Sequence, residues 1–265
     1  MAELQQAEHD VGHDYVATQP HVAHDVLRNR ICTDLSALVR EIIQRDGRCR
    51  VLEVGGGHGT FTETLVAAGA TVTVTEMSGP SADALMRRFA GSGDVRIQLD
   101  ADGEFLAESP KQSFDLVVFV SVLHHIPDYL GTIQEAIRVL AVGGAIYSVQ
   151  DPLWYPRRTR TNLVADKLAY FAWRIFRGGY RRGVATRIRR IRGIYDESNP
   201  ADMVEYHVVR DGVDEEALQR AMARHFTTVS VWKYWSTQSG LLQRLGQTLA
   251  RPTTFGLRAT GRTIQ

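Results

Sequence analysis

Two adjacent histidines are the residues of this sequence best suited to take a proton from a substrate. His124 and His125 come just after a nearly apolar run at 114–121, and Asp151 follows a β-rich run at 145–150. An imidazole titrates near neutral pH, and a neighbouring carboxylate can orient the ring and stabilise its charged form. We therefore expect one histidine to act as a general base with Asp151 as its partner, and the other to be structural.

Three further acids lie at or near the ends of separate β-rich runs. Glu53 belongs to the first run, Glu76 is the last residue of the second, and Asp100 is the last residue of the third. Glu76 lies where the second strand of a nucleotide-binding unit places a carboxylate that accepts both ribose hydroxyls. Each acid alone could be an ordinary strand-end residue. Strand-end acids grouped around one glycine turn indicate a cofactor site, because open parallel sheets bind ligands at the carboxyl ends of their strands.

A strand, a tight turn and a helix position the first of these acids. The apolar run 50–54 leads into the glycine-rich turn 55–59 and then into a helical segment, 60–69, in which Thr60 and Glu63 have the spacing of a capping box. Glycines in the turn allow a ligand to approach the backbone closely. The turn should therefore bind a polar group.

The spacing of the glycines discriminates between cofactors. The dinucleotide pattern G-x-G-x-x-G does not fit, because its last position falls on a threonine in either possible frame. The pattern that fits is Glu53-x-Gly55-x-Gly57-x-Gly59. This mismatch and the absence of a Tyr-x-x-x-Lys pair argue against a nicotinamide-dependent reductase.

Strands and helices alternate regularly from the first β-rich run to Asp151, which predicts a doubly wound α/β fold with a mostly parallel, seven-stranded sheet. After a break, a helix at 214–225 and β-rich runs at 227–235 and 254–260 complete the pattern. The predicted units are an N-terminal helical cap (1–47), a cofactor-binding core (48–152), a basic helical lid (153–204) and a C-terminal completion of the core (205–265).

The composition excludes several classes of protein. No apolar run approaches the roughly 18 residues that a membrane span requires, and the first residues are acidic and polar, unlike a secretory signal. We therefore expect a cytoplasmic protein. Cys32 and Cys49 are the only cysteines and lack CxxC spacing, so neither a disulfide framework nor a structural zinc site is supported.

Four histidines near the N-terminus raise the alternative of a metal site. Their spacings could place imidazole pairs on one helix face, but no cysteine or converging carboxylates complete a ligand set. We expect no metal and a solvated leading arm. The residues concerned are His9, His13, His21 and His24.

Positive charge is concentrated in one segment. Residues 156–193 contain eleven Arg and one Lys against one Asp, a net charge of +11, so the remaining residues carry −10 of the total of +1. A helical substrate lid with a solvated arginine face is the simplest interpretation. The alternatives are recognition of an anionic acceptor and peripheral contact with an anionic membrane that carries a lipid-linked acceptor. No RNA-binding module is visible, so nucleic acid is not an expected partner.

From about residue 15 to 151, and more loosely from 205 onward, the chain resembles class I S-adenosylmethionine-dependent methyltransferases. The resemblance implies that Glu53 and the backbone of Gly55 and Gly57 hold the methionine part of the cofactor. It implies that Glu76 accepts from the ribose hydroxyls and Asp100 from the adenine amino group. The other residues that it assigns to S-adenosylmethionine, or to the product S-adenosylhomocysteine, are Tyr15, Met77, Ala101, Val120 and Ser121.

The run His124-His125-Ile126-Pro127, preceded by Leu123, is similar to a Leu-His-His-Ile-Pro signature of small-molecule and sugar O-methyltransferases. In such enzymes a histidine of this motif works with an aspartate at the end of the fifth strand. This sequence departs from the pattern by one residue, since Gln150 occupies the expected position and Asp151 follows it. The alternative to a His–Asp pair is catalysis by positioning alone, with Asp151 stabilising the loop before Pro152.

Taken together, the sequence predicts an S-adenosylmethionine-dependent O-methyltransferase acting on a small-molecule or glycosyl acceptor, anionic or lipid-linked, in natural product or glycan biosynthesis. N-methylation of a small amine or peptide amine is the alternative within the same chemistry. A non-catalytic cofactor-binding or interaction protein is the alternative outside it. The residues that we expect to contact the acceptor are Trp154, Tyr155, His207 and Arg210. The oligomeric state stays open.

Overall fold

The structure is a computed structural model that describes residues 19–159, 161, 211–248 and 252–263. The strands are β1 (Arg50–Val54), β2 (Thr71–Glu76), β3 (Val95–Leu99), β4 (Phe114–Val120), β5 (Leu140–Pro152), β6 (Phe226–Tyr234) and β7 (Thr254–Arg262). The helices are α3 (Pro20–Ala23), α4 (Asp25–Asp46), α5 (Thr60–Ala67), α6 (Gly79–Arg88), α7 (Phe105–Glu108), α8 (Tyr129–Val139), α12 (Glu215–Ala223) and α13 (Gly240–Thr248), with 3-10 turns η1 (Leu123–His125) and η2 (Tyr155–Arg157).

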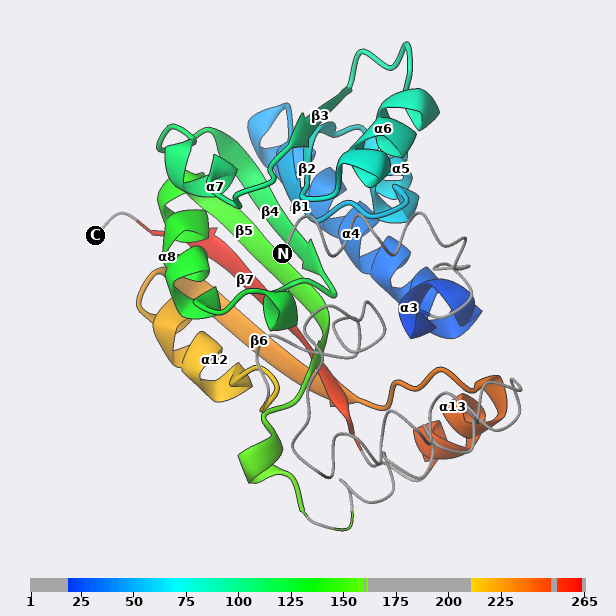
Figure 1. Cartoon of the computed structure of the whole chain (residues 1–265). Coiled ribbons are helices and arrows are strands. Elements are labelled where there is room, and N and C mark those ends of the chain that lie inside the picture. Colours follow the sequence, from blue (N-terminus) through cyan, green and yellow to red (C-terminus); the bar gives the residue numbers. More distant parts are fainter. Residues whose placement is uncertain (1–18, 160, 162–210, 249–251, 264–265) are drawn as a thin grey trace.

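The strands form one seven-stranded sheet in the order β3-β2-β1-β4-β5-β7-β6 (Figure 1). Strands β1 to β5 pair in parallel, whereas β7 runs antiparallel to both β5 and β6. The strand order reverses at β1 and β4, so the connections that leave these two strands diverge and open a crevice at their carboxyl ends. The predicted mostly parallel, doubly wound α/β sheet is confirmed.

Helices cover both faces of the sheet. Figure 1 shows α4, α5 and α6 over one face and α7, α8 and α12 over the other. Strand β4 is buried along its whole length, as its continuous apolar run predicts, and it serves both cores. Leu116 and Val118 pack in the cluster that contains α4, whereas Val117 and Phe119 pack in the cluster that contains α8. The carboxyl ends of the central strands are therefore held between two apolar layers.

The glycine turn leads into α5 differently from the sequence prediction. The helix is capped by Gly59, whose φ is 80° and which has no side chain to accept a capping hydrogen bond. The predicted capping box between Thr60 and Glu63 is wrong, because the Glu63 carboxylate pairs with Arg88 at 2.6 Å. A left-handed residue at this point lets the chain reverse direction tightly while keeping side chains out of the turn.

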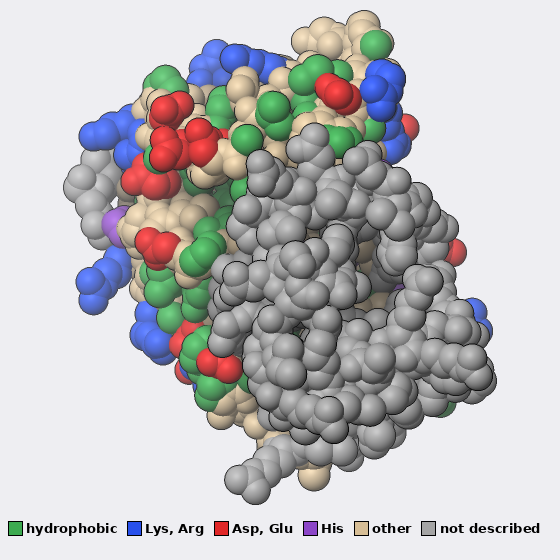
Figure 2. All heavy atoms as spheres, viewed as in Figure 1, with side chains coloured by type: hydrophobic (Ala, Val, Ile, Leu, Met, Phe, Trp, Pro, Cys, Tyr) green, Lys and Arg blue, Asp and Glu red, His purple; other side chains and the backbone are tan. Residues whose placement is uncertain are grey.

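The described surface on the side shown in Figure 2 intersperses basic and acidic side chains among apolar ones. Among the described residues, no helix combines the length and the apolar character needed to cross a membrane. The predicted helical lid falls almost entirely outside the described residues, as do most of the arginines of the basic segment. The predicted domain boundaries stay predictions.

Candidate functional site

A cavity of about 690 Å³ lies at the carboxyl ends of β1 to β4. Its walls come from the strand ends, the glycine turn, α3 and the loop that follows β4. It brings together most of the residues predicted from the sequence: Glu53, Gly55, Gly57, Glu76, Met77, Asp100, Ala101, Val120, Ser121 and His125. Residues that are far apart in the sequence thus share one concave, partly apolar site of the size that a small-molecule cofactor needs.

Glu53, on β1, is a buried carboxylate in the wall of this cavity. Its side chain accepts a hydrogen bond from the Thr62 hydroxyl at 2.5 Å, and the residue is 2% exposed. Burial raises the pKa of Glu53 to about 7, an effect that the Thr62 hydrogen bond opposes and the nearby Glu76 reinforces. A buried carboxylate is costly unless a cation or several donors accompany it. Glu53 therefore fits the ammonium group of an amino acid moiety.

Glu76, at the end of β2, anchors the glycine turn. Its carboxylate accepts the backbone N–H of Gly57 at 3.0 Å and of Ser78 at 3.2 Å, and burial raises its pKa despite these donors. The N–H of Gly55 donates to the carbonyl of Thr75 at 2.9 Å. Both glycine N–H groups are thus engaged within the protein. The two glycines therefore favour ligand binding because, without side chains, they let the ligand approach the backbone closely.

The Gly57 position shows that close approach most clearly. Its φ is +53°, and a Cβ built there would meet no atom within 4 Å, so the residue borders open space. A Cβ at Gly55 would instead lie 2.8 Å from Val122 Cγ2. Gly57 is needed for the left-handed bend. Gly55 is needed for the packing of the turn against the loop after β4.

Asp100, just after β3, completes the acidic rim. Its carboxylate accepts the N–H of Phe105 at 3.0 Å, and burial raises its pKa. Met77, Ala101 and Leu106 line the same part of the cavity. A carboxylate beside apolar side chains suits a flat heterocycle with an exocyclic amine. The three acceptor carboxylates, from Glu53 through Glu76 to Asp100, therefore fit S-adenosylmethionine along its length.

The residues predicted to be catalytic lie after β4, in η1, and near the end of β5. His124 Nδ1 is 2.7 Å from Asp151 Oδ1, and the His124 backbone N–H donates to the same oxygen at 3.1 Å. The other carboxylate oxygen, Oδ2, accepts from the Ser148 hydroxyl at 3.1 Å. Both residues of the pair are buried. A carboxylate that accepts Nδ1–H fixes the tautomer in which Nε2 is the basic nitrogen, which is the arrangement a general base requires.

A β-bulge explains the one-residue departure noted in the sequence. Gln150 has a φ of 73°, and the pairing of β5 with β7 shifts register between Val149 and Asp151. The Gln150 side chain contacts Tyr234 and Ser236, whereas Asp151 faces the same side as Ser148. The extra residue in the strand therefore rotates Asp151 toward His124.

His125 and His124 have different surroundings. His125 lines the cavity, and the ring of the buried His124 contacts it, with the two ring centroids 4.0 Å apart. The turn that presents them begins after Ser121, whose φ is 61° and whose N–H donates to the carbonyl of Val149 at 2.8 Å. This bond ties the end of β4 to β5 and so sets the distance between the histidines and Asp151.

His21, on α3, is a cavity residue that sequence reasoning missed. We expected it to belong to a solvated arm, but it is 3% exposed, lines the cavity and stacks on Phe61 at 5.9 Å between ring centroids. Its Nδ1 is enclosed and has no hydrogen-bond partner among the described residues. Burial and the nearby His124 lower its pKa to about 3, so the ring is neutral. The expectation of a solvated arm is wrong at this position.

Two of the residues predicted to contact the acceptor, Trp154 and Tyr155, are not among the residues that line the cavity. Trp154 and Tyr155 lie at the start of η2, where the Trp154 N–H donates to Glu215 at 3.4 Å and the Tyr155 ring packs under Arg158. Tyr15, His207 and Arg210 lie outside the described residues. Within the described part of the chain, no cluster of three or more His, Cys, Asp or Glu side chains is arranged to hold a metal ion. The acceptor contacts stay a prediction.

Comparison with known proteins gives the same fold and cofactor class. A family model described as a methyltransferase domain matches residues 23–225. A ubiquinone biosynthesis O-methyltransferase of Pseudomonas entomophila is 33% identical over 99 residues, which are 37% of this chain and 42% of the relative. One of Paracidovorax citrulli is 33% identical over 100 residues, with the same coverage. The chain thus spans less than half the length of these curated relatives.

Solved structures extend the likeness to nearly the whole chain. The N-methyltransferase NodS from Bradyrhizobium japonicum, in complex with S-adenosylhomocysteine, has a TM-score of 0.55 at 16% identity and covers 98% of this chain and 99% of its own. The DszA carbon methyltransferase has a TM-score of 0.55 at 13% identity, with 92% and 57% covered. At these identities the likeness establishes the fold alone.

Proposed function

Because the chain belongs to the methyltransferase domain family of class I S-adenosylmethionine-dependent enzymes, we propose that it methylates a hydroxyl of a small-molecule or glycosyl acceptor. The observation that carries this proposal is the buried His124–Asp151 pair beside the cofactor cavity, with a 2.7 Å contact between Nδ1 and Oδ1. The resemblance of the cofactor-binding region to curated O-methyltransferases supports the hydroxyl as the reacting group.

The protein's own part in the reaction is to position the acceptor and to remove its proton. S-adenosylmethionine supplies a methyl group that its sulfonium centre already activates. Glu53, Glu76 and Asp100 would hold the cofactor at three separate points, which fixes where the methyl group points. A hydroxyl becomes a good nucleophile only as a base takes its proton, and positioning alone supplies the remaining acceleration.

We assign the base role to His124 and the wall of the acceptor site to His125. Asp151 keeps the proton on Nδ1 of His124, so Nε2 takes the proton from the acceptor and the resulting imidazolium is stabilised by the buried carboxylate. His125 lines the cavity and would contact the acceptor directly. An amine acceptor would lose its proton to the same nitrogen, so the experiment must identify the methylated atom.

The net positive charge of one segment supports a proposal about the chemical class of the acceptor. The segment 156–193 carries a net charge of +11 and begins shortly after β5, which ends at Pro152. Such a charge suits an acceptor with carboxylate, sulfate or phosphate groups, including one linked to an anionic lipid. This part of the proposal is independent of the hydroxyl chemistry and can fail without it.

The test is to incubate the protein with cell extract and S-adenosylmethionine carrying a labelled methyl group, and to locate the label by mass spectrometry. We expect a labelled oxygen on a small or glycosyl compound. The variants His124→Ala and Asp151→Ala should abolish labelling, and His125→Ala should weaken it, while all three retain S-adenosylhomocysteine binding. Label on nitrogen would replace the O-methyl proposal with the N-methyl one. Unchanged turnover in all three variants would overturn the assigned base.

A further inference from the structure

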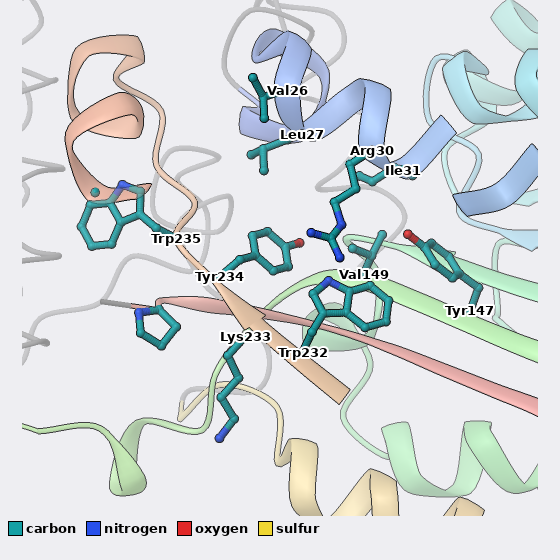
Figure 3. Close-up of a pocket in the computed structure, with 12 residues that line it drawn as sticks. Val26, Leu27, Arg30, Ile31, Tyr147, Val149, Trp232, Lys233, Tyr234 and Trp235 are labelled. Carbon is teal, nitrogen blue, oxygen red and sulfur yellow. The ribbon is translucent and has the colours of Figure 1, made fainter. Parts of the chain in front are cut away.

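A second cavity, of about 460 Å³, lies between the first turns of α4 and the antiparallel edge of the sheet (Figure 3). Its walls come from α4, β5, β6, α13 and the residues on either side of α13. None of its lining residues borders the cofactor cavity. A cavity of this size is in the range that binds small molecules. It is therefore separate from the site described above.

Four of its twelve lining residues are aromatic. Figure 3 shows Trp232, Tyr234 and Trp235 from the end of β6 and Tyr147 from β5 around the space below α4. Trp232 and Tyr147 have their ring centroids 6.0 Å apart, and Val26, on the α4 side, is 65% exposed. Aromatic and aliphatic side chains that remain open to solvent in a concave surface are typical of a ligand site.

The polar atoms of three of these rings are engaged in hydrogen bonds within the protein. The Tyr147 hydroxyl donates to Asp34 at 3.2 Å and the Tyr234 hydroxyl to Gln150 at 3.0 Å. The Trp235 Nε1–H donates to the carbonyl of Leu242 at 3.0 Å. With these groups engaged, the rings offer the cavity their apolar faces and edges. Such surfaces bind a flat apolar body better than a polar one.

Two glycines allow the indoles to lie against the backbone. A Cβ at Gly256 on β7 would come within 2.2 Å of the Trp232 ring, and a Cβ at Gly246 on α13 would come within 2.2 Å of the Trp235 ring. Both rings therefore pack directly on main chain, which fixes their orientation. The aromatic walls are a built feature of the fold and not a chance grouping of surface side chains.

Arg30 gives the cavity its positive charge. Its guanidinium lies over the Trp232 ring at 5.7 Å, and its side chain is 62% exposed. Its closest carboxylate, Asp34, is 3.8 Å away, and Arg30 makes no hydrogen bond to any described residue. The other basic lining residue, Lys233, is paired with Glu215 at 2.9 Å and points away from the cavity in Figure 3. The N–H groups of Arg30 are thus the donors that an anion here would meet.

We propose that this aromatic cavity is a second ligand site, which binds a planar apolar compound carrying a carboxylate or a similar anionic group. The planar body lies against Trp232 and Tyr234, and the anionic group lies at Arg30 near the mouth. Aromatic stacking supplies most of the affinity, because a charge pair at an exposed guanidinium contributes little. The proposal does not depend on the identity of the methyl acceptor.

The test uses naphthalene-2-carboxylate as the probe and its neutral analogue naphthalene-2-methanol as the comparison. The full chain is labelled with 5-fluorotryptophan, and its four tryptophans are observed by fluorine NMR. We expect the carboxylate to shift the signals of Trp232 and Trp235 in a saturable way while those of Trp154 and Trp173 stay in place. The alcohol should shift the same two signals with an affinity roughly two- to five-fold lower.

Charge-reversal variants separate a specific contact from long-range attraction. Arg30→Glu should weaken binding of the carboxylate and leave the alcohol unaffected, whereas Arg40→Glu, the same change elsewhere on α4, should alter neither. S-adenosylhomocysteine should not displace the probe. Absence of a saturable shift at Trp232 and Trp235, or displacement by S-adenosylhomocysteine, would overturn the proposal. Equal effects of the two variants would refute the anion contact.

Discussion

The two halves of the candidate site are built in different ways. At the ends of β1, β2 and β3, regular parallel strands deliver Glu53, Glu76 and Asp100 to one edge. At the ends of β4 and β5, the chain needs left-handed backbone at Ser121 and Gln150 to bring His124 and Asp151 together. Such conformations cost on the order of 1–3 kcal/mol each and persist only where the surrounding structure enforces them.

This difference indicates what each half must do. A cofactor is bound by several separate contacts, so each strand end can contribute independently. A base and its orienting carboxylate must meet within hydrogen-bond distance, and regular strand geometry does not place them there. Variants in the β4–β5 half should therefore affect turnover, and variants in the β1–β3 half should affect cofactor affinity.

The largest expected effect is that of Asp151→Asn. The amide keeps the shape but can no longer hold the proton on Nδ1 of His124 as a carboxylate does. We expect turnover on the acceptor to fall by about a hundred- to ten-thousand-fold, with S-adenosylhomocysteine affinity unchanged. Turnover is measured with labelled methyl donor and affinity by calorimetry. A loss of both would mean that the two halves are not separate.

Next in size is Glu76→Gln. The carboxylate accepts two backbone N–H groups and, as we propose, the ribose hydroxyls. Hydrogen bonds to a charged group contribute about 1.5–3 kcal/mol, so S-adenosylhomocysteine should bind roughly ten- to a hundred-fold more weakly. Glu63→Gln is the matched control, since Glu63 lies in the adjoining helix and pairs with Arg88 on the surface. Turnover at saturating cofactor should change far less than in Asp151→Asn.

The contrast between regular strand ends and left-handed backbone also explains which site residues could be predicted from the sequence. Strand ends and glycine spacing are local patterns, and they located Glu53, Glu76 and Asp100 in one cavity. The bulge at Gln150 has no comparable signal, because its conformation is set by pairing with β7 and by contacts to Tyr234 and Ser236. The sequence therefore showed a mismatch of one residue without its cause.

His21 was missed for a related reason. The helix α3 has only four residues, which is too short for an apolar periodicity that would predict burial. Its burial comes from packing on Phe61 in α5 and from its place in the cavity wall. Both contacts join segments that are distant in the sequence, and a reading of local pattern cannot detect them.

The third prediction concerns pH in the β1–β3 half. The pKa of Glu53 is raised from 4.5 to about 7, so the carboxylate that would pair with the cofactor's ammonium forms only as pH rises through 7. We expect S-adenosylhomocysteine to bind about tenfold more tightly at pH 8 than at pH 6. Glu53→Gln should remove this dependence and bind weakly at both values. Calorimetry at constant ionic strength measures it.

Protein stability without cofactor should change in the opposite direction. A raised pKa means that the folded protein holds this proton more tightly than the unfolded chain, so the stability that Glu53 contributes is complete below pH 4.5 and is lost as pH rises through 7. Glu53→Gln should therefore raise the melting temperature at pH 8 and change it little at pH 4.5. An equal shift at both values would show that Glu53 does not titrate near neutral pH.

The smallest expected effect, that of His21→Phe, tests to which half the missed histidine belongs. The phenyl ring keeps the stacking on Phe61 and removes an enclosed Nδ1 that has no partner among the described residues, so unfolding should cost up to about 1 kcal/mol more. His24→Phe is the control, because His24 Nε2 contacts the carbonyl of Thr237 at 2.7 Å and the loss of this contact should destabilise the fold.

Turnover of the same His21→Phe variant shows which half His21 serves. If His21 serves the β4–β5 half, the acceptor KM rises several-fold while S-adenosylhomocysteine affinity stays constant. Because the ring is already neutral, the pH profile of turnover should keep its shape, and a shifted profile would instead make His21 a titrating partner of His124.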